Sequence, residues 1–436
     1  MGIFSTMPVV SLPLGPVDIS VFRILFYGIL ALLLYQTISK GFASIRKHSG
    51  LMIIWLTIGV ISCLIGWVFL QGKAPKFSSA AGSFIPKTLA YLVFAVLWGN
   101  QDSETLKHTN RMLIRGILWG CIINAVWAIT DAAGYYLLHR SINNLVFARY
   151  IARNNIRYGE LSLIINGQIR SGGFNYDPAH LGFISPLLTC YGLKRKQKRY
   201  LFLALGSIVA SASTTALVCS VIVAVLNYFM FAPRKNGYIN RRNAGIAITA
   251  VVLCGIIIGV NWSRVSSLAE NAAGKMIDRI NNVYLNSGDT DIRWDYLLLA
   301  PKAFLNLGVF MLTGTGFGTA SYGYVTDTGI LYRVGGSYEA FDLENTYICY
   351  LMDTGIIGLA LFLIILAILI YAYRNRTKAP CSRETDITVF SGVMATSLSM
   401  LFYHYILFAP QMLILAGGLS ELDLNDPDTD SLISRE

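Results

Sequence analysis

The chain has 436 residues, of which 54% are hydrophobic and only 14% are charged. The apolar residues are gathered into runs of about twenty, long enough for a helix to cross a hydrocarbon layer of roughly 30 Å. Because a helix satisfies its own backbone hydrogen bonds in lipid, this pattern excludes a soluble globular protein. It predicts an all-α polytopic membrane protein with roughly 10–12 spans, in a single membrane-embedded domain over residues 1–436.

The formal net charge of +11 would suggest a nucleic-acid partner in a soluble protein. Here the positive charge is concentrated in short loops between apolar runs, which indicates membrane orientation instead and argues against nucleic acid. The loops with basic clusters are expected to face the cytoplasm and lie at 40–48, 107–115, 194–199, 234–242 and 374–383. The two longest polar segments, 139–178 and 263–344, are then expected on the opposite face.

In chain order, the apolar runs predict spans at 19–38, 51–70, 87–100, 113–136 and 179–193. The next apolar stretch, 201–231, has basic clusters at both ends, so it is predicted to enter and return as two half-spans hinged near 211–215. A single long tilted helix is the alternative. Further spans are expected at 244–262 and 345–373, with one or two more in 387–419, before an acidic tail at 420–436 that is expected to be disordered.

The first long polar loop contains arginine but no lysine. Its arginines are Arg140, Arg149, Arg153, Arg157 and Arg170. Three of them recur every fourth residue, so on a helix Arg149, Arg153 and Arg157 form one stripe. Because guanidinium matches phosphate oxygens with a planar fork of donors, the stripe is a candidate phosphate track. The alternative is an interfacial helix whose arginines reach lipid headgroups.

Arg170 lies outside this stripe, in a glycine-containing segment at 168–180. The sequence of that segment is Gln-Ile-Arg-Ser-Gly-Gly-Phe-Asn-Tyr-Asp-Pro-Ala-His. Its two glycines let backbone approach a ligand closely, and a span begins directly afterwards. We therefore favour a functional role for Arg170. Tyr176, Asp177 and His180 belong to the same segment and are further candidates.

In the second loop, Asp289-Thr-Asp-Ile-Arg293 precedes a helical pattern, so Arg293 is expected in a first helical turn, where an anion is favoured. An ion pair with Asp291 or Asp295 is the alternative. The Asp-x-Asp at 289–291 is interpreted as helix capping, and the histidines show no metal-ligand spacing, so neither a metal nor another cofactor is expected. Thr-Gly-Thr-Gly-Phe-Gly at 313–318 is expected to form a flexible turn.

The second loop ends at Glu344 and Asn345, and the following span contains Asp353. A helical projection places Asn345 and Asp353 on roughly one face. A carboxylate inside a membrane span is functional by default. The alternative for Asp353 is a buried hydrogen bond that fixes helix packing.

These features follow one another in a characteristic order. The order is Arg170 with Gly-Gly and Asp-Pro, Arg293 with an aromatic-rich helix, Thr-Gly-Thr-Gly-Phe-Gly, Glu344-Asn345, and Gly355-x-x-Gly358. In this respect the region at about 140–370 resembles the O-antigen polymerase and O-antigen ligase superfamily. Its members are inverting glycosyltransferases of the membrane-embedded C type, which take a glycan from undecaprenyl diphosphate on the periplasmic face.

The resemblance implies a metal-independent site in a multi-pass protein of the bacterial inner membrane. Arg170 and Arg293 would bind the carrier diphosphate. Further candidates for substrate binding, taken from the residue patterns themselves, are Arg149, Arg153, Arg157, Asn345 and Tyr176. Glu344 would be the catalytic base, since partial burial raises the pKa of a carboxyl group toward a useful value. Asp177, His180 and Asp353 are the other candidates for that role.

The resemblance also implies partners, which are the carrier-linked glycan donor and acceptor, the lipid bilayer, a chain-length regulator and a flippase. The ligase branch usually has histidine where this chain has Glu344, which favours a polymerase of oligosaccharide repeat units. Alternatives are a ligase that transfers the glycan to lipid A-core, and a repeat-unit flippase. The chain lacks an internal repeat and its arginines lie in loops, which weakens the flippase interpretation.

Overall fold

The computed structural model describes residues 1–14, 17–42, 46–70, 77–150, 161–165, 168–231, 234–235, 238–239, 304–305, 307–318, 332–334, 337–339, 345–378, 382–403 and 407–424. The chain divides into two units, Met1–Val225 with Phe304–Glu436, and Leu226–Ala303. The predicted span at 244–262 and most of the predicted loop at 263–344 lie outside the described residues.

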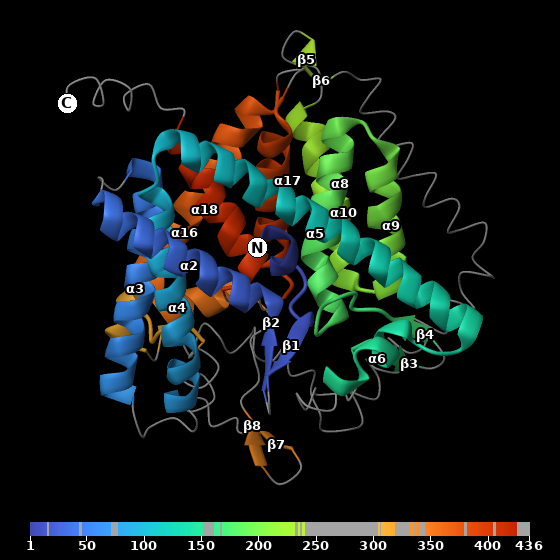
Figure 1. Ribbon diagram of the computed structural model, residues 1–436, viewed down its shortest axis with the longest axis horizontal. Helices are drawn as coiled ribbons and strands as arrows, with labels where there is room; N and C mark the ends of the chain where they lie inside the picture. Colours follow the sequence, from blue (N-terminus) through green and yellow to red (C-terminus); the bar gives the residue numbers. More distant parts are fainter. Residues whose placement is uncertain are drawn as a thin grey trace. The chain divides into compact units, whose positions relative to one another are not determined.

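The described elements are mainly helices (Figure 1). The longer ones are α2 (Val21–Lys40), α3 (Lys47–Leu70), α4 (Phe77–Gly99), α5 (Ser103–Leu138), α8 (Leu181–Arg195), α9 (Lys198–Ser211), α10 (Thr214–Phe231), α16 (Thr346–Arg376), α17 (Glu384–Ser399) and α18 (Ala409–Asp423). The short ones are α1 (Gly2–Ser5), α6 (Ile142–Val146), α14 (Phe310–Thr313) and the 3-10 turn Pro178–His180.

The strands pair as four antiparallel two-stranded hairpins. They are β1 (Ser11–Leu14) with β2 (Val17–Ser20), β3 (Leu163–Ile165) with β4 (Gln168–Arg170), β5 (Arg234–Lys235) with β6 (Tyr238–Ile239), and β7 (Tyr332–Val334) with β8 (Ser337–Glu339). In the β3–β4 register Leu163 lies opposite Arg170. These hairpins lie within the segments that connect helices, and they form no larger sheet among the described residues.

Four of the described helices are long and apolar enough to cross a membrane, over Val21–Lys40, Lys47–Val68, Ser103–Leu138 and Thr346–Arg376. Shorter apolar helices cover Phe84–Gly99 and Thr215–Phe231. The prediction of a helical membrane protein is thus confirmed. The number of spans stays a prediction.

Most helices begin and end close to the predicted spans. The stretch 201–231 is broken as predicted, because α9 ends at Ser211, Ala212 adopts a left-handed conformation with φ of 45°, and α10 begins at Thr214. The alternative of one long helix is therefore wrong. The stretch 387–419 holds two helices, α17 and α18. By contrast, α4 starts at Phe77 rather than near 87, because Pro86 is accommodated inside the helix. Helix α5 starts at Ser103 rather than near 113, so the basic segment 107–115 predicted to be a loop lies within this helix.

The predicted disordered tail begins too early. Residues 420–423 complete α18, and both Glu421 and Asp423 are buried. The Asp423 carboxylate accepts hydrogen bonds from the backbone N–H groups of His48 (2.7 Å) and Ser49 (2.9 Å), at the first turn of α3. A helix start offers unpaired N–H donors and favours a negative charge, which explains why these acidic residues are held in the fold.

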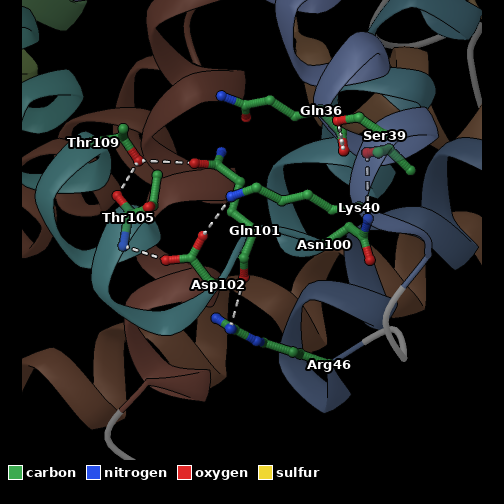
Figure 2. Close-up of polar contacts among 10 residues, drawn as sticks. Gln36, Ser39, Lys40, Arg46, Asn100, Gln101, Asp102, Thr105 and Thr109 are labelled. Atoms are coloured by element: carbon green, nitrogen blue, oxygen red, sulfur yellow. Dashed lines mark hydrogen bonds and ion pairs between the residues drawn. The ribbon is translucent and has the colours of Figure 1, made fainter.

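The end of the helices where α2 stops and α3 starts carries many charged contacts, and we call it the basic end. Figure 2 shows Arg46 donating to the carbonyl of Gln101 (2.9 Å), while Lys40 pairs with Asp102 at 3.8 Å. Asp102 also caps α5, and its hydrogen bonds from Thr105 hold the pKa of the Asp102 carboxyl below its ordinary value. The basic loop at 40–48 therefore also joins helices.

Other predicted basic clusters are found at the same end. Lys194, in the last turn of α8, donates to the carbonyl of Thr377 after α16 (2.9 Å). Arg115 on α5 pairs with Glu384 at the start of α17 (3.3 Å). The opposite end, where α8, α16 and α18 begin, is called the loop end.

A cluster of aromatic rings joins α3 to α16. The fully buried Trp55 lies 5.3 Å from Phe317, 5.3 Å from Tyr350 and 5.0 Å from Phe362, measured between ring centroids. Edge-on and tilted ring contacts of this kind stabilise the fold further, in addition to the favourable burial of the large rings. They fix the segment around Phe317 against these two helices.

Candidate functional site

Arg170 is the last residue of β4 and lies at the loop end. The next residue, Ser171, donates its backbone N–H to the carbonyl of Ala210 near the end of α9 (2.9 Å). Arg170 is half-buried, and its Nε is buried without a hydrogen-bond partner among the described residues. A buried guanidinium donor without an acceptor is costly, so the position suits an anion.

The Gly172-Gly173 turn that follows approaches α5. Gly173 has φ of +62°, and a Cβ there would overlap the Asn124 side chain. The Asn124 oxygen accepts from the N–H of Phe174 (3.1 Å). The glycines were predicted to let backbone approach a ligand, but here they let the turn approach a helix. This contact fixes the direction in which Arg170 leaves the β3–β4 hairpin.

A buried carboxylate on α5 organises the same loop. Asp131 is fully buried and accepts three hydrogen bonds, from the Ser141 hydroxyl (2.9 Å), the Asn143 backbone N–H (2.8 Å) and the Ser162 hydroxyl (2.6 Å). The Asn143 side chain in turn donates to the carbonyl of Gly173 (2.8 Å). Asp131 thereby connects the start of α6 and the strand region to the turn beside Arg170.

Sequence reasoning missed Asp131 and Asn124. The available signal was a carboxylate and an amide inside the apolar run at 113–136, where an unpaired polar group would be unfavourable.

Asp177 and His180 form a local cap at the start of α8. The Asp177 carboxylate accepts from the backbone N–H of Ala179 (2.7 Å), and the His180 Nδ1 lies 3.2 Å from the carbonyl oxygen of Asp177. Since a carbonyl oxygen only accepts, Nδ1 carries the proton in this contact and Nε2 carries the lone pair in the neutral ring. The contact therefore holds the His180 ring in a fixed orientation at the start of α8.

The loop between α17 and α18 brings His180 and the start of α16 to one place. The His180 ring lies 5.3 Å from the Tyr403 ring and 5.3 Å from the Phe408 ring. The backbone oxygen of Tyr403 accepts from the Thr346 hydroxyl (2.7 Å). Asn345 caps α16 and donates to the carbonyl of Leu401 (3.0 Å).

Two predicted site segments far apart in the sequence thus meet on one loop. Tyr403 is a residue that the sequence did not single out, because its role arises only from this tertiary contact.

Tyr176 and Arg149 lie on the outer side of the first loop. The Tyr176 hydroxyl donates to the carbonyl of Pro8 (3.2 Å) and accepts from the Tyr150 hydroxyl (3.0 Å). Burial, followed by the neighbouring Tyr176, raises the pKa of Tyr150. Arg149 is exposed, so it is accessible to a phosphate or a headgroup.

Asp353 has a clear packing role. It is fully buried in α16, and its carboxylate accepts from the backbone N–H of Gly318 (2.8 Å). The backbone of Gly316 donates to the Asp353 carbonyl (2.7 Å), beside the kink at Gly355, where φ is +67°. The segment 313–318 was predicted to be a flexible turn; instead it is fastened to this kink. This geometry supports the structural interpretation of Asp353.

Several predicted site residues lie outside the described part of the chain. They are Arg153, Arg157, Arg293 and Glu344. Glu344 directly precedes the capping residue Asn345 in the sequence.

The described site segments can supply a cation, a base and a fixed framework. Arg170 offers guanidinium donors, His180 offers an oriented imidazole, and the start of α16 is tied to the same loop as His180. Together with the four apolar helices, these features define a helical membrane protein with a polar site at one end of its helices.

No protein-family model matches the chain, and no similar sequence is found among the curated proteins.

Proposed function

We propose that the protein is an inverting, metal-independent glycosyltransferase that joins oligosaccharide repeat units carried on undecaprenyl diphosphate into a surface polysaccharide such as O-antigen. The observation that carries this proposal is the meeting of the 177–180 segment with the start of α16 on the α17–α18 loop. Arg170, the expected phosphate ligand, lies seven positions before Asp177 on the same loop. The resemblance in motif order supplies the reaction class.

The reaction requires three events at one place. The bond between the anomeric carbon and the diphosphate oxygen breaks, and the diphosphate leaves with the electron pair. A hydroxyl oxygen of the acceptor sugar attacks the same carbon from the opposite face, which inverts its configuration. The hydroxyl proton passes to a base. Preorganised cations such as the Arg170 guanidinium stabilise the charge that develops on the leaving diphosphate.

Glu344 and His180 are the two candidates for the base. Glu344 is favoured by its position directly before the cap of α16, and His180 by the contact that directs its Nδ1 proton toward Asp177. In the proposed arrangement the site faces the periplasm from the inner membrane, where a chain-length regulator and a flippase would act beside it.

The proposal is tested with purified full-length protein and a synthetic undecaprenyl-diphosphate repeat unit, with products separated as a ladder on a gel. Wild-type protein should give a ladder, and Arg170→Ala should lower the rate by roughly 100-fold or more. Arg140→Ala is the matched control, since Arg140 is an exposed arginine of the same loop. It should leave the ladder intact.

A wild-type ladder from Arg170→Ala would contradict the assigned role of that arginine. Transfer that occurs only after lipid A-core is added would replace the polymerase assignment with the ligase. Absence of any bond formation, together with movement of the carrier-linked unit across a vesicle membrane, would assign a flippase instead.

A further inference from the structure

Helix α5 is longer than a membrane span requires. Its 36 residues extend for about 54 Å as a straight helix, whereas a hydrocarbon layer of roughly 30 Å needs about 20 residues. The apolar run within α5 begins at Leu113, and residues 103–112 precede it. These first turns are therefore not needed to cross the layer.

Contacts with three other helices show that the first turns of α5 run along the basic end. Arg46, the residue before α3, donates to the hydroxyl of the first residue of α5 (3.2 Å). The Asn110 amide donates to Glu421 near the end of α18 (3.1 Å). Arg115 pairs with Glu384, the first residue of α17 (3.3 Å). Figure 1 shows the resulting course of α5, which passes obliquely across α8 and α9.

This part of α5 has one buried face and one cationic face. Its buried side chains recur at the spacing of one side of a helix; they are Leu106, Asn110, Leu113 and Ile114. Its exposed basic side chains are Lys107, His108, Arg111 and Arg115. A helix that is cationic on its outer face and runs along the end of a membrane domain is typical of segments that lie in the membrane interface.

Exposed apolar side chains adjoin the cations on the outer face. Met112 is 63% exposed and Trp119 is 56% exposed. Trp119 follows Arg115 by four positions, so its indole lies one turn farther into the apolar run. Indole rings favour the boundary between headgroups and hydrocarbon, which places the preceding cations at the level of the lipid headgroups.

Lys107 and Arg111 are available to a ligand. Their side chains make no hydrogen bond or ion pair with any residue that the structure describes. The two positions are four apart, so both side chains project from the same side of the helix. An ammonium and a guanidinium one turn apart can donate to different oxygens of one phosphate group.

The carboxylates beside these cations leave a net positive charge. Asp102 caps α5 and pairs with Lys40, and Glu384 is paired with Arg115. Glu104 is exposed in the first turn of α5 and offsets one of the two available cations. The outer face of these turns therefore complements an anionic headgroup.

We propose that residues 103–119 of α5 form a docking surface for an anionic phospholipid in the leaflet at the basic end. Lys107 and Arg111 hold the phosphate of the headgroup, and Met112 and Trp119 contact the acyl chains. The surface lies outside the residues proposed for glycan transfer and does not depend on that function.

The test measures binding of phosphatidylglycerol with a fluorescent acyl chain to purified full-length protein in an uncharged detergent. Lys107→Gln with Arg111→Gln should weaken binding roughly fivefold for each cation removed. The charge-preserving pair Lys107→Arg with Arg111→Lys should bind as wild type does. Unchanged affinity in the Gln variant overturns the surface.

The matched control is Lys198→Gln with Arg199→Gln, which removes one lysine and one arginine from exposed positions at the start of α9, also at the basic end. Arg199 is engaged by its neighbours, since it donates to Gln197 (3.1 Å) and to the Tyr200 hydroxyl (3.2 Å). This variant should keep wild-type affinity. An equal loss in the control would assign binding to the overall positive charge and overturn the α5 surface.

Soluble competitors identify the partner. Lipid that stays bound in the presence of equal concentrations of glycerol 3-phosphate and of an acidic peptide supports the proposal. Displacement by glycerol 3-phosphate would indicate a site for free phosphate esters, and displacement by the peptide would indicate an acidic protein partner; either result overturns the lipid assignment.

The wild-type protein provides a further measurement if the Gln variant unfolds. Binding through exposed cations must weaken as ionic strength rises. Constant affinity between low and high salt would therefore overturn the proposal without any variant.

Discussion

Single polar residues within apolar helices carry much of the organisation of the first loop. Arg170 was identified from the sequence because it stands among glycines in a polar segment. Asp131 and Asn124 were not identified, because hydropathy averages over a whole span and a single polar residue hardly changes the average. Their partners lie ten or more positions away along a loop, and only the folded chain brings them together.

At the residue scale, Asp131→Ala should destabilise the protein by roughly 3 kcal/mol, because three buried donors lose their acceptor. Ser162→Ala removes one of these bonds and should cost about 1 kcal/mol. The measurement is the thermal unfolding midpoint in detergent, with equal concentrations and lipid. Equal midpoints for the two variants would show that Asp131 is not the centre of the network.

At the element scale, hydropathy predicted where most helices lie but gave no indication of the kink in α16. The kink at Gly355 depends on close backbone contact with the Leu312 carbonyl, so a side chain cannot be placed there. Glycine spacing in the sequence suggested a motif without revealing its partner. The partner is the 313–318 segment, whose glycines contact α16, α3 and α4.

Gly355→Ala should destabilise the protein by roughly 2–3 kcal/mol, since the added Cβ meets backbone and φ is positive. Gly28→Ala in α2 is the matched control, because a Cβ at Gly28 meets nothing within 4 Å. It should leave stability unchanged or raise it by about 0.5–1 kcal/mol. Thermal unfolding of both variants checks this. A Gly355→Ala protein as stable as Gly28→Ala would mean that the kink is readily straightened.

At the scale of the whole first unit, buried acidic residues join helices that are distant in sequence. Glu421 accepts from the Asn110 amide (3.1 Å) and lies 3.6 Å from Arg383, while Asp423 joins α18 to α3. The sequence suggested a disordered acidic tail because acidic residues near a chain end usually remain solvated. Here helix N–H groups and cations at the basic end offset the free-energy cost of burying the two carboxylates.

Asp423→Asn should lower the stability of the protein by roughly 2–3 kcal/mol, because an amide cannot accept all the bonds that reach both carboxylate oxygens. Glu104→Gln, at an exposed position in the first turn of α5, should change stability by less than about 0.5 kcal/mol. Hydrogen exchange of α3 and α18 measures the effect locally. Unaltered exchange at the start of α3 in the Asp423 variant would refute this account.

The bond between His48 and Asp423 also constrains the order of assembly, since it spans 375 positions of sequence. During synthesis α3 is made long before α18. Until α18 is made, the N–H groups in the first turn of α3 lack the Asp423 carboxylate and are expected to be hydrated at the membrane interface. The α17–α18 loop that holds Tyr403 arrives equally late. Insertion of α17 and α18 would therefore be the step that fixes α3 in place through Asp423. The same step would complete the polar site through the loop that holds Tyr403.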